Sequence, residues 1–327
     1  MFRLTCGYRG LHLADALRLR EPGGGGPGLP DPRSDATAIR SFRDRRIETE
    51  PTVTYQLTNL TVVTGASSGI GAQIARRLAA RGARLLLTGR DAGRLRTVVD
   101  SLGSAAAAAE LVPADLADPA GVEAVVAAIR DRPVDLLVNN AGFATFGPHA
   151  GLDPRAETDV VAVNCTAVVA LTRAVLPGML VRGRGFVLNI ASTIAFQPAP
   201  GQATYGASKA FVLSFSEALA EEVRGTGVRV AVACPGPTDT AFLSATGRPE
   251  EAATSAIYRR RDSAARVAAV AVGMLDGHRV VKVVGRTNSV VAQAGRLTPR
   301  PVMRRISGRL LRPHPSTRGP APAPKGR

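Results

Sequence analysis

A glycine-rich loop between a short apolar run and a helical stretch constrains this chain more than any other feature. Residues 60–64 are β-branched and apolar, glycines follow at 65, 69 and 71, and a helical pattern covers 72–80. Glycine allows a tight turn and lets the backbone approach a pyrophosphate closely, and the next helix presents free N–H groups to an anion. An ordinary structural turn would not need three glycines in seven residues. The sequence therefore predicts a dinucleotide-binding loop.

Short apolar strands alternate with helices along most of the chain. We expect further strands at 84–88, 111–113, 134–138, 185–190, 228–234 and 279–284, and helices around 92–102, 119–130, 155–176, 205–224 and 264–275. Nearly continuous apolar strands that alternate with helices are typical of a parallel sheet covered on both faces. The predicted fold class is therefore α/β, with one doubly wound parallel sheet of the Rossmann type.

The two ends of the chain differ from this pattern. Residues 1–56 hold a glycine- and proline-rich run and no sustained apolar period, which predicts a disordered extension. A gene start placed too far upstream explains that segment equally well. Met1 is followed by no apolar stretch of a secretory signal. We expect the folded domain to cover 57–286 and a basic, partly amphipathic tail to cover 287–327.

The net charge of +16 belongs mainly to that tail. Residues 296–327 carry nine basic groups and no acid, whereas residues 60–295 have a net charge of only +5. This distribution argues against a nucleic-acid module in the folded domain. Val302, Met303, Ile306 and Leu310 fall on one helical stripe with arginines outside it. The stripe is typical of a basic helix on an anionic membrane surface, or equally of a helix docked on its own domain or on a partner subunit.

Composition narrows the class of protein and the compartment. The 327 residues include only three cysteines, which form neither a metal-binding spacing nor a disulfide framework. No uninterrupted apolar run reaches the about 18 residues of a membrane span. We therefore expect a soluble cytoplasmic protein, possible contact of its tail with a membrane surface aside, and no metal site.

A tyrosine and a lysine four residues apart predict acid–base chemistry. Tyr205 and Lys209 would lie one turn apart on the same face of a helix. A neighbouring ammonium stabilises the phenolate and lowers the pKa of a phenol, which makes it a workable proton donor and acceptor. Only three of the 42 basic residues are lysines, so this chain keeps a compact cation at 209 although it uses arginine nearly everywhere else. A surface Tyr–Lys pair is the alternative interpretation.

The end of the second predicted strand bears on the choice of cofactor. Arg90 stands where an acidic residue would bind the adenosine ribose of NAD, and an arginine there favours the 2′-phosphate of NADP. Asp91 follows directly and offers an alternative, because it would bind NAD if the acid were displaced by one position. We interpret Asp91 as the cap of the next helix and predict NADP(H), with NAD(H) as the second choice.

Over about residues 58–285 the chain resembles the short-chain dehydrogenase/reductase family. The resemblance lies in motifs that occur in the family's order and spacing: Thr64–Gly71, Asp115–Leu116, Asn139–Gly142, Asn164, Ser192, Tyr205 with Lys209, and Pro235–Gly236 followed by Thr238 and Thr240. It implies an enzyme that transfers hydride between a nicotinamide cofactor and a carbonyl or secondary alcohol. It also implies a homo-oligomer.

The resemblance assigns a role to each matching position. The catalytic residues would be Asn164, Ser192, Tyr205 and Lys209, with Asn164 holding a water, Ser192 donating to the substrate carbonyl and Tyr205 exchanging the proton. Asn139 would stabilise the central sheet. The cofactor would contact Gly65, Ser67, Ser68, Gly69, Ile70, Gly71, Arg90, Asp115, Leu116, Asn140, Ala141, Gly142, Tyr205, Lys209, Pro235, Gly236, Thr238 and Thr240.

Apolar residues follow three of the predicted strands and suggest a small apolar ketone or alcohol as substrate. The expected pocket residues are Phe143, Phe146, Ile194, Phe196 and Phe242, because ligands of open α/β sheets bind at the carboxyl ends of the strands. Three alternatives remain open at this stage. They are an NAD-dependent alcohol dehydrogenase, a dinucleotide-sensing regulatory protein that has lost catalysis, and a membrane-bound scaffold that acts through its basic tail.

Overall fold

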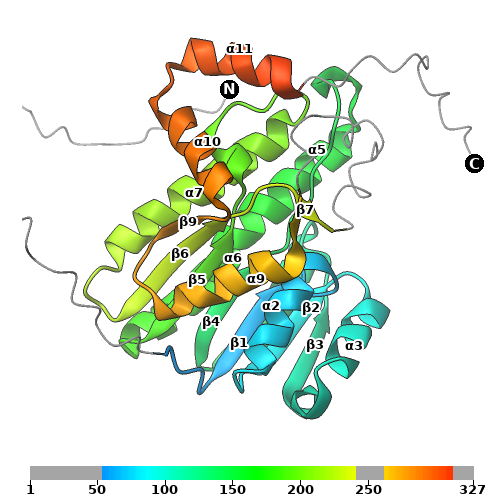
Figure 1. Ribbon diagram of the computed structural model, residues 1–327. Helices are drawn as coiled ribbons and strands as arrows, with labels where there is room; N and C mark the ends of the chain where they lie inside the picture. The colour runs from blue at the N-terminus through cyan, green and yellow to red at the C-terminus, as the bar shows by residue number, and fades with distance from the viewer. Residues whose placement is uncertain (1–53, 241–260, 312–327) are drawn as a thin grey trace, which may run out of the picture. The chain divides into compact units, whose positions relative to one another are not determined.

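The computed structural model describes residues 54–240 and 261–311. Its centre is a seven-stranded sheet in which every neighbouring pair is parallel, in the order β3-β2-β1-β4-β5-β6-β9 (Figure 1). The strands are β1 (Leu60–Thr64), β2 (Arg84–Gly89), β3 (Ala109–Pro113), β4 (Val134–Asn139), β5 (Gly185–Ile190), β6 (Val228–Cys234) and β9 (Val281–Val283). The predicted doubly wound fold is confirmed.

Helices cover both faces of this sheet. Helices α2 (Gly69–Ala79), α3 (Ala92–Asp100) and α9 (Ala264–Gly273) pack into one core layer, and α4 (Pro119–Ile129), α6 (Ala167–Val181) and α7 (Ala203–Glu222) pack into the other. Successive strand residues point to opposite faces. In β1, Val62 belongs to one layer and Val63 to the other, and both are fully buried. This explains why the strands read as unbroken apolar runs.

The strand order places the loops of β1 and β4 side by side. The chain runs from β1 outward to β3 and then returns across the sheet to β4, which pairs with the other edge of β1. The carboxyl ends of the parallel strands therefore form a crevice where the strand order reverses, which is where ligands of such sheets bind.

The predicted long helix over 155–176 is divided into three segments. It begins as α5 (Pro154–Val161), widens to a π-helical turn η3 (Ala162–Thr166), and continues as α6 to Val181. Asn164 lies in the wide turn, as is common for functional positions in helices. The segment 154–181 is the only described helix long and apolar enough to cross a membrane by length and composition, and 44% of its most apolar window is buried inside the protein.

The folded part begins earlier than residue 57. Tyr55 packs edge-on against Phe186 of β5, with ring centroids 5.7 Å apart, and its hydroxyl donates to the Asp135 carbonyl oxygen. Its backbone N–H donates to Asp276. Thr54–Gln56 thus belong to the described domain, while the rest of the predicted extension lies outside the described residues.

The predicted tail contains two helices, α10 (Arg286–Leu297) and α11 (Arg300–Leu311). The structure divides the expected apolar stripe of α11, because Met303 is buried while Val302 and Ile306 are exposed. The side chain of Leu310 and the residues after 311 lie outside the described part of the chain. A short pair of strands, β7 (Thr238–Asp239) and β8 (Asp262–Ser263), was not anticipated.

Candidate active site

The glycine loop packs too tightly for any side chain at two of its positions. Gly65 has a φ of +63°, and a Cβ there would lie 2.8 Å from the Ala141 Cα. A Cβ on Gly71 would lie 2.2 Å from the Gly65 carbonyl oxygen. Glycine at these positions lets α2 and the β4 loop close around the turn. Gly71 therefore acts through packing and, unlike its neighbours in the loop, does not line the cavity.

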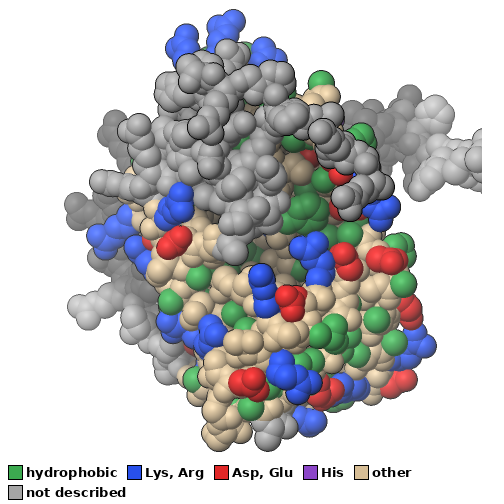
Figure 2. All heavy atoms as spheres, turned by 90° about the vertical axis from the view of Figure 1, so that its right-hand side faces the viewer, with side chains coloured by type: hydrophobic (Ala, Val, Ile, Leu, Met, Phe, Trp, Pro, Cys, Tyr) green, Lys and Arg blue, Asp and Glu red, His purple; other side chains and the backbone are tan. Residues whose placement is uncertain are grey.

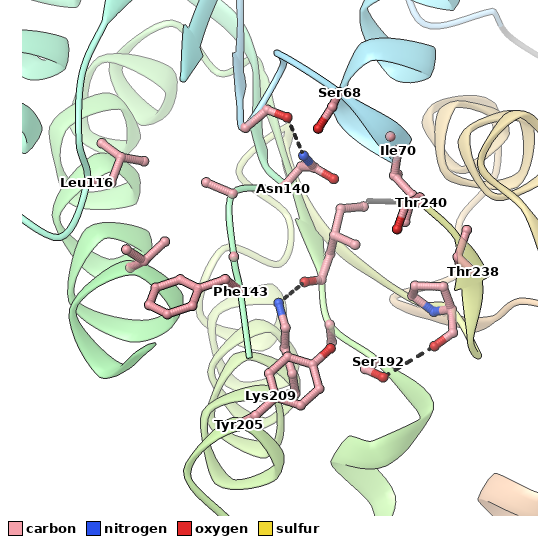
Figure 3. Close-up of a pocket in the computed structure, with 18 of the residues that line it drawn as sticks. Ser68, Ile70, Leu116, Asn140, Phe143, Ser192, Tyr205, Lys209, Thr238 and Thr240 are labelled. Carbon is pink, nitrogen blue, oxygen red and sulfur yellow. Dashed lines mark hydrogen bonds between the residues drawn. The ribbon is translucent and has the colours of Figure 1, made fainter. Parts of the chain in front are cut away.

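Asn140 joins the loops of β1 and β4 (Figure 3). Its side-chain amide donates to the carbonyl oxygens of Thr64 at 2.9 Å and Gly65 at 3.2 Å. In return, the Thr64 hydroxyl accepts from the backbone N–H groups of Asn140 and Ala141. These bonds hold together the two loops that flank the point where the strand order reverses.

A cavity of about 570 Å³ extends along this edge of the sheet. It brings together nearly all the predicted cofactor and catalytic residues, which come from seven separate parts of the chain. The lining includes Gly65, Ser67, Ser68, Gly69, Ile70, Arg90, Asp115, Leu116, Asn140, Ala141, Gly142, Ser192, Tyr205, Lys209, Pro235, Gly236, Thr238 and Thr240.

Arg90 and Asp91 have different roles at the end of β2. Asp91 is the N-cap of α3: one carboxylate oxygen accepts from the Arg94 N–H at 2.9 Å, and the other lies 3.3 Å from the Arg94 Nε. The carboxylate is thus engaged by the first turn of its own helix. Arg90 is exposed, and both Arg90 and Asp91 line the cavity.

Helix α7 carries Tyr205 and Lys209 into the cavity, where Ser192 approaches from the end of β5 (Figure 3). Lys209 Nζ donates to the Ile190 carbonyl oxygen at 2.9 Å and lies 5.9 Å from the centre of the Tyr205 ring. Both side chains are buried. Burial lowers the pKa of Lys209 to about 8. The Ser192 hydroxyl donates weakly to the Pro235 carbonyl oxygen at 3.4 Å, a bond that a substrate oxygen can replace.

Asn164 fixes the loop after β4 to α7. Its amide nitrogen donates to the Phe143 carbonyl oxygen at 3.1 Å and to the Ser208 hydroxyl at 2.9 Å, and its oxygen accepts from the Phe143 N–H at 3.2 Å. The side chain is fully buried, so these bonds have no competing water. Gly142 lies between this amide and Lys209, where a Cβ would be 2.9 Å from the Asn164 Oδ1 and 3.2 Å from Nζ.

The predicted substrate residues are only partly gathered in the cavity. Phe143 and Ile194 line it. Phe146 does not, because it is fully buried in the core, and that expectation was wrong. Phe196 does not line it either, because it packs against the core cluster beside Val232. Phe242 lies outside the described residues.

A buried carboxylate beside the cavity was missed by the sequence analysis. Glu157 on α5 accepts from the hydroxyls of Thr145 and Thr204 and lies 3.0 Å from the His149 Nδ1. Burial raises the pKa of the Glu157 carboxyl, but these hydrogen bonds outweigh burial and leave its pKa below the usual range. Thr204 directly precedes Tyr205. A signal was present, since Glu157 precedes Asn164 by seven residues and shares its helical face.

Comparison with known proteins agrees with this geometry. A family model described as short chain dehydrogenase matches residues 59–251. A putative ketoacyl reductase from Streptomyces coelicolor is 42% identical over 189 residues, which cover 57% of this chain and 72% of the relative. An NADP-dependent 3-hydroxy acid dehydrogenase from Salmonella typhi is 40% identical over 185 residues, which cover 54% and 71%.

Solved structures show the same likeness. A short-chain dehydrogenase from Sphingobium yanoikuyae in complex with NADPH superposes with a TM-score of 0.65 at 31% identity, over 72% of this chain and 92% of that one. The family model's range, residues 59–251, includes the glycine loop, Ser192, Tyr205 and Lys209. The chain therefore belongs to the short-chain dehydrogenase family of oxidoreductases.

Proposed function

We propose that this protein is an NADP(H)-dependent oxidoreductase that interconverts a carbonyl and a secondary alcohol on an apolar substrate. One observation carries the proposal: Ser192, Tyr205 and Lys209 share a single cavity with the glycine loop. A hydroxyl donor, a phenol and a buried cation next to a dinucleotide cradle are the parts that such a reaction needs. A regulatory protein that had lost catalysis would not need all three.

The described residues fit a dinucleotide phosphate. The loop residues Gly65 and Ser67–Ile70 line the cavity up to the N-terminus of α2, which is suited to a pyrophosphate. Arg90 would meet the 2′-phosphate, because the carboxylate of Asp91 is already engaged by the first turn of α3. The same engagement counts against the NAD-dependent alternative. The NADP-dependent relative and the solved complex with NADPH support this choice.

The mechanism follows from the positions of three side chains. Bound NADPH supplies the hydride. The Ser192 hydroxyl donates a hydrogen bond to the substrate carbonyl oxygen, and Tyr205 donates its phenolic proton to that oxygen as negative charge develops there. Lys209 stabilises the phenolate that remains, because it is a cation buried 5.9 Å from the ring centre. These donors are in place before reaction, so their reorganisation costs little.

The catalytic side of the cavity carries apolar side chains together with the polar Thr193, Gln197 and Gln202 and the carboxylate of Asp159. Phe143, Val163 and Ile194 line it, and none of the described lining residues from the loops after β4 and β5 is an arginine or lysine. A cavity of this kind suits an apolar ketone without a carboxylate next to the reacting carbon. Hydrophobic ketones, including acyl chains with a 3-oxo group, are therefore the substrates to test first.

The decisive experiment follows the absorbance of NADPH and NADH separately with a panel of hydrophobic ketones. We expect turnover with NADPH, and a fall of about 10²–10⁴-fold in Tyr205→Phe while NADPH binding is retained. Unchanged turnover in that variant would remove the acid–base role. Binding of NADPH without turnover on any ketone would favour the regulatory alternative.

A second variant tests the cofactor assignment. Arg90→Ala should weaken the binding of NADPH much more than the binding of NADH, because only NADPH carries the 2′-phosphate. Arg96→Ala, which removes an exposed arginine of α3 that does not line the cavity, is the matched control. Equal effects of Arg90→Ala on both cofactors would count against NADP(H).

A further inference from the structure

The two C-terminal helices expose more large apolar side chains than any other part of the described chain. Ten such side chains are exposed in the described residues, and half of them lie between residues 286 and 311. They are Val290 (70% exposed), Val291 (53%), Leu297 (84%), Val302 (45%) and Ile306 (41%). Exposed apolar side chains gathered in this way mark an interaction surface.

These side chains face away from the folded domain. On α10, Ala292 is buried, and a Cβ on Gly295 would lie 3.2 Å from the Phe196 carbonyl oxygen, so this face packs on the domain. Val290 and Leu297 lie seven residues apart on the opposite face. On α11, Met303 is buried and Val302 and Ile306 lie beside it in the exposed part. Docking on the domain thus uses one face and leaves a second apolar face uncovered.

The same 26 residues are strongly basic. They contain six arginines and neither an aspartate nor a glutamate: Arg286, Arg296, Arg300, Arg304, Arg305 and Arg309. The described side chains among them, all but Arg296, are exposed. Figure 2 shows basic side chains at the upper end of the molecule, where Figure 1 places α11. We call residues 286–311 the tail surface.

The charge and composition of the tail surface indicate which kind of partner it can bind. Pairing it with itself across a two-fold axis would bring twelve arginines together without an acid, which like-charge repulsion disfavours. It contains no aromatic residue on which a nucleic-acid base could stack. Apolar side chains flanked by arginines instead match a membrane surface, where the apolar groups enter the headgroup boundary and the arginines meet anionic lipids.

We propose that the tail surface binds the surface of a membrane that contains anionic lipids. The contact is peripheral, with α10 and α11 lying along the interface. Because α10 packs against the segment Thr193–Phe196, which includes the cavity-lining residue Ile194, the membrane lies next to the substrate side of the cavity. The proposal does not depend on the oxidoreductase function, since binding is measured without turnover.

Flotation of the full-length chain with vesicles tests the proposal. We expect binding to vesicles of phosphatidylcholine with about 30% phosphatidylglycerol at 0.1 M salt, and much weaker binding to phosphatidylcholine alone or at 0.5 M salt. Arg304→Glu combined with Arg305→Glu should reduce the partition coefficient at least about 30-fold, since each lost arginine contributes about fivefold. The control is Arg96→Glu combined with Arg173→Glu, which changes the net charge by the same amount outside the tail surface. This control should bind the anionic vesicles more strongly than the tail variant does.

The apolar part has its own variant and control. Val290→Ser with Leu297→Ser should weaken binding, whereas Val181→Ser, which changes an exposed apolar residue at the end of α6, should not. Hydrogen exchange of the wild-type chain on vesicles should slow within residues 286–311, which tests the site without any variant. No binding by the wild type, equal binding to both vesicle types, or exchange slowed only elsewhere would overturn the proposal. The proposal would also be overturned if the tail surface were protected from hydrogen exchange by an oligomer of the chain in the absence of vesicles.

Discussion

Gly142→Ala gives a sharp test of the site geometry, because the added methyl group would lie between two functional side chains. Its Cβ would be 2.9 Å from the Asn164 Oδ1 and 3.2 Å from the Lys209 Nζ. Ordinary contacts of carbon with such atoms are about 3.5 Å, so the two groups must separate from the methyl by roughly 0.3–0.6 Å. Three hydrogen bonds hold the Asn164 amide. We therefore expect Lys209 to move.

The expected result is a loss of turnover larger than the loss of stability. A displacement of about 1 Å at a catalytic group costs about 10²-fold in rate, so for a shift of roughly 0.3–0.6 Å we expect kcat to fall by about 10-fold. Overpacking of this kind destabilises by about 1–3 kcal/mol. Steady-state oxidation of NADPH measures the first effect, and thermal unfolding measures the second.

Gly273→Ala is the matched control. Gly273 ends α9, and a Cβ there would meet nothing within 4 Å. We expect its kcat to equal that of the wild type. If Gly142→Ala kept wild-type kcat, Lys209 would have no need of its observed position, and the reasoning about the catalytic cation would be refuted.

Three further predictions concern the same domain. Because burial lowers the pKa of Lys209 to about 8 from 10.5, the ammonium is lost above that pH in the free enzyme, and kcat/KM for reduction should fall there. Between pH 8 and about 10 Lys209 is protonated in the unfolded chain but not in the folded one, so the free energy of unfolding of the wild type should rise with pH in that window. The Lys209→Met variant should show no such rise. A free energy of unfolding from urea titrations that does not change with pH in the wild type would contradict this. Glu157→Leu leaves the Thr145 and Thr204 hydroxyls without their acceptor, so it should lower the free energy of unfolding by about 1–3 kcal/mol and also lower kcat. Glu157→Gln should retain more of both, and equal stability and kcat in all three proteins would exclude a positioning role. Phe211 on α7 is exposed and stacks on Phe215, so Phe211→Arg should convert the expected homo-oligomer to monomers in light scattering, and an unchanged mass would place the interface elsewhere.

The architecture and the chemical centre could be predicted from the sequence, because both depend on spacing along the chain. Nearly unbroken apolar runs with helices between them determine a covered parallel sheet whatever the details of packing. Gly65 and Gly71 reveal a tight turn, and Tyr205 and Lys209 share a helical face because 3.6 residues make a turn. Ser192 follows a strand whose carboxyl end reaches the same edge.

Contacts between distant parts of the chain were decided only by the tertiary structure. Phe143 and Phe146 stand three residues apart in one loop, yet one lines the cavity and the other is fully buried in the core. The bonds of Glu157 reach residues 12 and 47 positions away, and the low pKa of Lys209 comes from burial by several elements at once. Periodicity along the chain identifies which face is buried. Which residues a side chain contacts on that face, and how far it is shielded from water, depend on long-range packing that no local pattern encodes.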